Sequence, residues 1–186
     1  VGQTQFGSGP DFAVSSVTLA NPRVAPGTNA QITTTIANSA VPFTGNVQYR
    51  LYLSTDDTLD TTGDIDLGLY TATFADEDSL DDQESVSIAA SIPGGRYFVI
   101  AVVDPRTRIP EVDEMNNEGI STTQLVNAID FVGQTATVNV STVQANDSVR
   151  VTGSASSTGL PFVGNVPIGV YFSADDAFDG TDTEAY

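Results

Sequence analysis

The sequence predicts an all-β fold, namely an immunoglobulin-like seven-stranded β-sandwich followed by a partial second copy of the same module. Two observations predict it. Short runs rich in β-branched and aromatic residues alternate apolar with polar side chains, and no window of helical length shows a 3.6-residue period. In addition, the chain resembles itself when residue 11 is aligned with residue 130.

Seven runs account for the strands of the first module. In chain order they are VSSVTLA (14–20), AQITTTIA (30–37), VQYRLYLS (47–54), LYTATF (69–74), ESVSIAASI (84–92), YFVIAVVD (97–104) and ISTTQLV (120–126). Turn-forming pairs such as Asn21-Pro22 and Pro26-Gly27 separate them. The run at 97–104 is almost continuously apolar, so we expect it to be a central strand. Seven strands are the number found in an immunoglobulin-like sandwich.

The internal repeat sets the domain organisation. Residues 11–60 align without a gap onto residues 130–179, with 15 identities over 50 positions. We therefore divide the chain into an arm (1–10), a first module (11–126) and an incomplete second module (127–186). The second module lacks counterparts of the last four strands, which leaves its core face and a sheet edge uncovered. Either the array continues beyond this sequence or another chain supplies the strands, and the arm is a linker or a strand donated to a neighbour.

Charge and composition exclude several classes of function. Twenty-four acidic residues face six arginines and no lysine, which gives a net charge of −18. Such a surface repels phosphate backbones and anionic lipids, so we expect no nucleic-acid partner and no attachment to anionic membranes. No apolar run approaches the ~20 residues of a membrane span.

The residue types that most catalysis needs are absent. The chain has no cysteine, histidine or lysine, so it offers no thiolate, imidazole base or Schiff-base amine. A serine triad of the usual kind is therefore impossible within this chain. A paired-carboxylate glycosidase is formally open, but its acid needs an apolar pocket, whereas these aspartates lie in polar loops. We expect no enzymatic activity.

The acidic loop LSTDDTLDTTGDIDLGLY (53–70) is the main candidate site. Five aspartates lie within eleven positions: Asp56, Asp57, Asp60, Asp64 and Asp66. The partial repeat keeps carboxylates at equivalent places and adds one beyond them: Asp175, Asp176, Asp179 and then Asp182. Because carboxylates and loop carbonyls are calcium ligands, the pattern predicts a Ca²⁺ site, with a spacing that is not that of an EF-hand. The alternative is that each aspartate forms a turn and is only solvated.

Other polar and aromatic clusters receive simpler interpretations. A second acidic stretch is interpreted as a solvated loop: Asp76, Glu77, Asp78, Asp81 and Asp82. Acidic and amide side chains also line the last hairpin: Glu111, Asp113, Glu114, Asn116, Asn117 and Glu118. There we expect carboxylates to pair with Arg106 and Arg108, and Asn117 to bond the loop backbone, with a ligand role for Asp104 or Glu111 as a secondary alternative. Four tyrosines at alternating strand positions favour core packing over a sugar-binding platform: Tyr49, Tyr52, Tyr70 and Tyr97.

Three segments of the first module resemble the CARDB family, the cell-adhesion-related domain found in bacteria and archaea. They are DFAVSSVTL…PRVAPGTNAQITTTIANSA over the first two strands, YLSTDDTLDTTGD after the third, and PGGRYFVIAVVDP…IPEVDEMNNEG in the final hairpin. The resemblance covers 11–125 in full and 130–186 in part. It implies a secreted or surface-displayed immunoglobulin-like repeat, found in tandem in large adhesins and beside extracellular enzymes, and it implies no catalytic residue.

Together these features predict a non-catalytic, extracellular structural or adhesive module, stabilised by calcium and part of a larger surface protein or fibre. Its expected partners are other copies of itself or adjacent repeats, joined by strand exchange, or a surface glycan or protein. The alternative is an accessory domain that binds a glycan or a protein for a neighbouring secreted enzyme.

Overall fold

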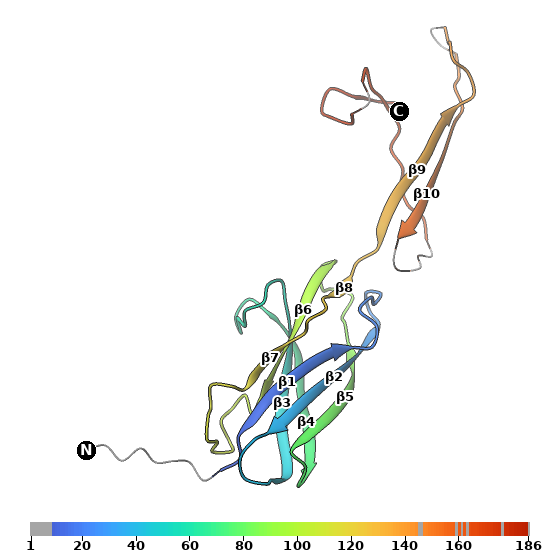
Figure 1. Ribbon diagram of the computed structural model, residues 1–186. Helices are drawn as coiled ribbons and strands as arrows, with labels where there is room; N and C mark the ends of the chain where they lie inside the picture. Colours follow the sequence, from blue (N-terminus) through green and yellow to red (C-terminus); the bar gives the residue numbers. More distant parts are fainter. Residues whose placement is uncertain are drawn as a thin grey trace.

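The structure is a computed structural model that describes residues 9–144, 147–158, 160, 162, 164–175 and 177–185. Most of the predicted arm (1–10) thus lies outside the described residues. A β-sandwich forms one body, and a long hairpin extends beyond one end of it (Figure 1). The regular elements of the described residues are all strands, and none of these residues belongs to a helix long and apolar enough to cross a membrane.

The first module forms two antiparallel sheets that share one core. One sheet has the order β1–β2–β5 and comprises β1 (Phe12–Leu19), β2 (Asn29–Asn38) and β5 (Ser79–Ser87). The other has the order β4–β3–β6–β7, with β8 also pairing β6, and comprises β3 (Thr44–Ser54), β4 (Ile65–Ala75), β6 (Gly95–Val103), β7 (Glu118–Ile120) and β8 (Leu125–Asn127). The predicted all-β, immunoglobulin-like fold is confirmed. The run at 97–104 falls largely in β6, which lies between β3 and β7 as expected.

Three of the predicted runs differ from the structure. The run at 69–74 belongs to a longer strand, β4, which begins at Ile65 and so includes Asp66 of the acidic loop. The run at 120–126 divides into β7 and β8, because the Ser121 hydroxyl accepts the Val99 N–H at 2.9 Å where a backbone carbonyl would continue the ladder. β5 begins well before residue 84, so Asp81 and Asp82 are strand residues and not part of a solvated loop. Their backbones pair with β2, which outweighs the low strand propensity of aspartate.

The core is filled by the inward-facing residues of both sheets. Phe12, Phe43 and Phe74 form an aromatic cluster at one end, with ring centroids 5.1 Å apart for Phe12–Phe43 and 5.3 Å for Phe12–Phe74. Edge-on pairs of this kind add about 0.5–1.5 kcal/mol each to the burial of the rings. The four tyrosines are buried or pack against the core, as predicted. Tyr49, Tyr52 and Tyr97 are buried, and Tyr70 packs against the core.

Strand β5 lies at the edge of its sheet and turns two carboxylates inward. Its alternation puts Asp82 and Glu84 on the same side as the buried Val86. Burial raises the pKa of Glu84, and the charge of Asp82 adds to this rise. Burial also raises the pKa of Tyr49 across the core, again with a contribution from Asp82. Inward-pointing charges on an edge strand disfavour the addition of a further strand.

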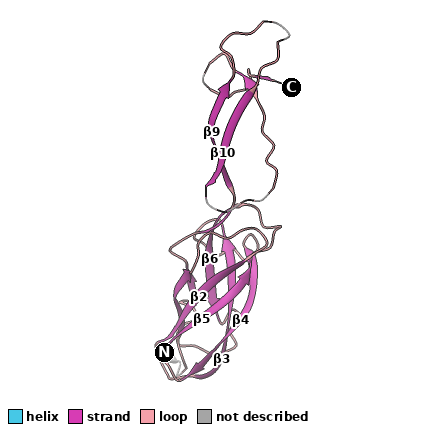
Figure 2. Ribbon diagram, turned by 90° about the vertical axis from the view of Figure 1, so that its right-hand side faces the viewer, coloured by secondary structure: helices cyan, strands magenta, loops and turns pink. Residues whose placement is uncertain are grey.

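The second module is an open arrangement. Its hairpin comprises β9 (Asp130–Val138) and β10 (Val151–Thr158), and a short pair follows, β11 (Tyr171–Phe172) with β12 (Thr183–Glu184). In both views the hairpin projects past the end of the sandwich (Figure 1, Figure 2). The β9–β10 hairpin has a bulge at the same place as the β1–β2 pair. The bulge leaves Ser15 unpaired in β1, and it leaves the aligned residue Gln134 unpaired in β9.

Candidate functional site

The acidic loop between β3 and β4 uses its aspartates to form turns. Asp56 Oδ1 accepts the Thr58 N–H at 2.9 Å. Asp60 Oδ1 accepts the N–H of Thr62 at 2.9 Å and its hydroxyl at 2.7 Å. In both cases the side chain bonds the backbone two residues ahead, which is the usual aspartate turn. The bonds from Thr62, its hydroxyl first and then its N–H, lower the pKa of Asp60 and so favour the carboxylate.

The last two aspartates of this loop have different partners. Asp64 Oδ2 accepts the Asp60 N–H at 2.8 Å, which closes the turn from its other end. Asp66 Oδ1 accepts the Gly68 N–H at 2.8 Å, and Asp66 Oδ2 lies 2.6 Å from Arg50 Nη1 on the neighbouring strand. The carboxylate of Asp66 is thus tied to the sheet by a surface ion pair and is directed away from the turn.

The corresponding loop of the second module repeats this geometry. Asp175 Oδ1 accepts the Ala177 N–H at 2.9 Å, as Asp56 does in the first loop. Asp179 Oδ1 accepts the N–H of Thr181 at 2.7 Å and its hydroxyl at 2.6 Å, and these bonds lower its pKa. Asp182 Oδ2 accepts the Asp179 N–H at 2.9 Å and closes a turn that is one residue shorter. Asp176 lies outside the described residues.

The described carboxylates do not converge on a common point. Calcium requires six to eight oxygen ligands at about 2.3–2.6 Å. Within the described part of the chain, no three acidic side chains come together in a way that could hold a metal ion. The structure links Asp60 to Asp64 through a backbone N–H, while Asp56 and Asp66 serve separate turns. This arrangement supports the turn-forming interpretation of the loop.

The last hairpin contains a buried carboxylate that fastens the first strand. Glu111 Oε2 accepts the Phe12 N–H at 2.6 Å, and Glu111 Oε1 accepts a bond from Asn117 Nδ2 at 3.3 Å. Burial raises the pKa of Glu111 to about 7, although the bond from Phe12 acts in the opposite direction. Asn117 therefore bonds a carboxylate as well as offering its backbone carbonyl to the Val103 N–H.

The expected pairing of this hairpin with arginines is not found. Among the described residues, the ion pair is Arg50–Asp66, and Arg108 Nη1 instead lies 3.5 Å from Gln48 Oε1. The hairpin carboxylates use backbone N–H groups, which are closer and already fixed in position. Sequence reasoning missed the role of Glu111 because its partner Phe12 is 99 residues away.

The second module exposes an apolar face. Together β9, β10 and the segment around β11 border an open groove of about 980 Å³, whose apolar lining includes Val151, Val166, Ile168 and Val170. Aligned residues are buried in the first module and exposed in the second. The relative exposures are 0% and 41% for Phe12 and Phe131, 0% and 66% for Tyr49 and Ile168, and 1% and 64% for Leu53 and Phe172. This face therefore exposes apolar residues at positions that are core positions in the first module.

Comparisons with known proteins found a matching family and similar solved structures. No curated protein matches the chain. Similar solved structures include the CARDB domain of a Pyrococcus furiosus protein in complex with di-metal ions, with 15% identity over 65% of this chain and 96% of that chain and a TM-score of 0.48. Another is Spo0M, a sporulation control protein from Bacillus subtilis, with 11% identity over 70% of this chain and 59% of that chain and a TM-score of 0.38. The CARDB family profile matches residues 9–121, which is more than half of the sequence. The chain therefore belongs to the CARDB family.

Proposed function

We propose that this protein is a non-catalytic, extracellular structural and adhesive segment, built from tandem CARDB modules and assembling with other copies of itself. The observation that carries the proposal is the recurrence, at aligned positions of the second module, of the aromatic pair and the aspartate turn of the first. The second module also exposes apolar residues at positions that are buried in the first, and contiguous exposed apolar surface marks a site that packs against another segment.

The tandem arrangement is supported by local geometry as well as by sequence. Phe131 and Phe162 pack edge-on with centroids 5.1 Å apart and an interplanar angle of 89°, the same values as their counterparts Phe12 and Phe43. The unpaired bulge residue and the aspartate turns also recur at aligned positions. Two segments that fold alike locally are expected to need the same second sheet to complete a core.

A second copy of this chain is the occupant that we propose for this face, and a further segment of a longer chain is the alternative. In a sandwich each sheet covers the apolar face of the other, so two incomplete modules can meet face to face about a two-fold axis. Among the described residues that line the groove, Asp147 is the single acidic one, although the chain has 24 acidic residues. Local repulsion therefore opposes this contact less than it opposes contacts elsewhere on the surface.

Calcium binding by the acidic loops stays a prediction. The turns formed by Asp56 and Asp60 need no metal, and the described carboxylates do not form a ligand cluster. The melting experiment described in the Discussion distinguishes the two roles.

Size-exclusion chromatography with light scattering tests the assembly. The chain is expected to dimerise as its concentration rises, at an ionic strength that screens its net charge. Ile168→Asp or Phe172→Asp, on the apolar face, should give a monomer. Met115→Asp is the control, because Met115 is 94% exposed in the first module, and it should leave the dimer intact. A chain that stays monomeric at every concentration contradicts the proposal, and so does a dimer that survives both charged substitutions.

A further inference from the structure

Two arginines lie in one row across three neighbouring segments of the first module. Arg96 of β6 pairs with Val126 of β8, and Val126 also bridges Arg23 on its other side. Residues directly opposite one another in a sheet point to the same face. The residues that follow or flank them in the sequence are buried, namely Val24, Tyr97, Leu125 and Asn127. The row of Arg23, Val126 and Arg96 therefore faces outward. Two strand spacings of ~4.8 Å separate the Arg23 and Arg96 Cα atoms by about 10 Å.

Neither arginine of this row forms an ion pair with a carboxylate of the described residues. In the described ranges, the arginine that forms an ion pair is Arg50, with Asp66. The chain has four acidic residues for each arginine, and two of its six arginines lie together at this place. Arg23 and Arg96 line an open pocket of about 460 Å³, and none of the described residues that line it is acidic. The pocket is a local positive site on a strongly negative protein.

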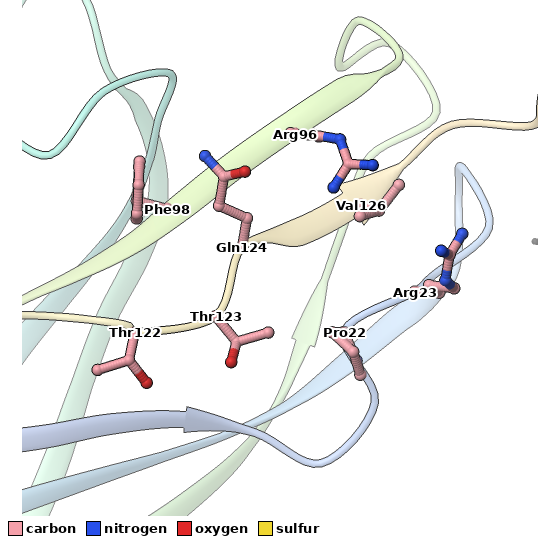
Figure 3. A pocket seen from close by; sticks show the side chains of 8 residues that line it. All are labelled: Pro22, Arg23, Arg96, Phe98, Thr122, Thr123, Gln124 and Val126. Carbon is pink, nitrogen blue, oxygen red and sulfur yellow. The ribbon is translucent and has the colours of Figure 1, made fainter.

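The rest of the pocket combines an apolar floor with a polar rim. Phe98 and Val126 supply the apolar surface, and Thr122, Thr123 and Gln124 supply two hydroxyl groups and an amide. In Figure 3 the two guanidinium groups lie on the side of Val126, while the threonines and Gln124 form the opposite side. A ligand that fits this lining carries an anionic group, hydroxyl groups and an apolar face.

Strand β8, in the middle of the pocket, is paired on both sides. The Val126 N–H donates to the Pro22 carbonyl at 2.7 Å, and the Val126 carbonyl accepts the Val24 N–H at 3.1 Å. On its other side β8 pairs with β6. An extended peptide cannot pair with β8 as a further strand, because both of its sides are already paired. A ligand that lies over Val126 is therefore recognised by side chains.

We propose that this pocket binds a sugar-acid unit of an acidic polysaccharide. The carboxylate pairs with the guanidinium groups of Arg23 and Arg96, which match its planar geometry. The C–H face of the sugar ring packs on Phe98, and the ring hydroxyls bond the polar rim. The pocket lies within residues 22–126, so this binding does not depend on the proposed assembly through the second module.

Isothermal titration calorimetry on the full chain tests the proposal, with trigalacturonate as the probe and neutral maltotriose as its comparison. The ionic strength is kept near physiological, where charges more than about 8 Å apart are screened. Trigalacturonate is expected to bind and maltotriose is not. Arg23→Gln and Arg96→Gln should each weaken binding about tenfold, as expected for loss of a charged hydrogen-bond partner, and the double substitution should abolish it.

Arg106→Gln is the matched control, because Arg106 is exposed, carries the same charge and lies outside the pocket. It should bind trigalacturonate as the unmodified chain does, and thermal melts should show that all variants are folded. The proposal is overturned if the unmodified chain does not bind, if maltotriose binds equally, or if Arg106→Gln weakens binding as much as Arg96→Gln. Equal binding of triglutamate overturns the assignment to a sugar acid and points to an acidic peptide.

Discussion

Glu111 Oε2 accepts the backbone N–H of Phe12 at 2.6 Å and so joins two residues that are 99 positions apart. The contact connects the last hairpin to the first residue of β1. Asp11, the preceding residue, adds to the connection, since it accepts bonds from Ser39 Oγ at 2.6 Å and Asn116 Nδ2 at 3.0 Å. These carboxylates close one end of the sandwich.

The first prediction concerns the pH dependence of stability. Burial raises the pKa of Glu111 from 4.5 to about 7, so between these values the folded chain holds a proton that the unfolded chain releases. The free energy of unfolding therefore decreases as the pH rises through this window. Glu111→Gln keeps an acceptor for Phe12 but cannot ionise, so urea unfolding across the window should show a smaller pH slope. Glu118→Gln, on the exposed side of β7, should keep the original slope, and unchanged slopes for Glu111→Gln contradict the prediction.

The second prediction compares two aligned phenylalanines. Phe12 is fully buried among Phe43 and Phe74, so Phe12→Ala should cost about 3–5 kcal/mol in the free energy of unfolding. Phe131 occupies the aligned position but is 41% exposed, so Phe131→Ala should cost much less in the monomer. Urea unfolding at low protein concentration measures both. Equal losses would mean that the second module has a closed core.

The third prediction separates turn formation from calcium binding. If Asp60 serves the turn, Asp60→Ala should lower the melting temperature, whereas Asp60→Asn, which keeps the acceptor for Thr62, should not. Melts at fixed ionic strength with calcium, magnesium or a chelator should then coincide. A rise specific to calcium, abolished by Asp60→Asn together with Asp64→Asn, would instead establish the predicted metal site.

The fourth prediction concerns the exposed edge of β5. Replacing its inward carboxylates by Asp82→Leu and Glu84→Val removes charges that burial disfavours, so the melting temperature should rise. The same change removes protection from the sheet edge, so light scattering should show faster aggregation. Asp81→Leu, on the outward side of the same strand, is the control. Aggregation equal to that of the control would mean that the inward charges do not protect the edge.

The sequence predicted the fold well because its strands alternate cleanly and its turns carry proline and glycine. The early start of β5 escaped prediction, since Asp81 and Asp82 have low strand propensity and only pairing with β2 places them in a sheet. The row of Arg23 and Arg96 had no local signal either. The two arginines come together because both pair with Val126, and residues so far apart in the sequence give no pattern that predicts this contact. The aspartate turns were among the alternatives that the sequence offered.

The matching bulges have a consequence for folding. Because Ser15 and Gln134 interrupt their strands at the same place, pairing of β1 with β10 would keep the register of its pairing with β2. One difference between the two partners is side-chain size. In the correct pair Ile36 lies opposite Val14, whereas Ala155 would bring only a methyl group to that position. Correct pairing of β1 with β2, rather than with β10, therefore depends on how well the partner fills the core. A large-to-small change at Ile36 should favour kinetic traps in which modules exchange hairpins.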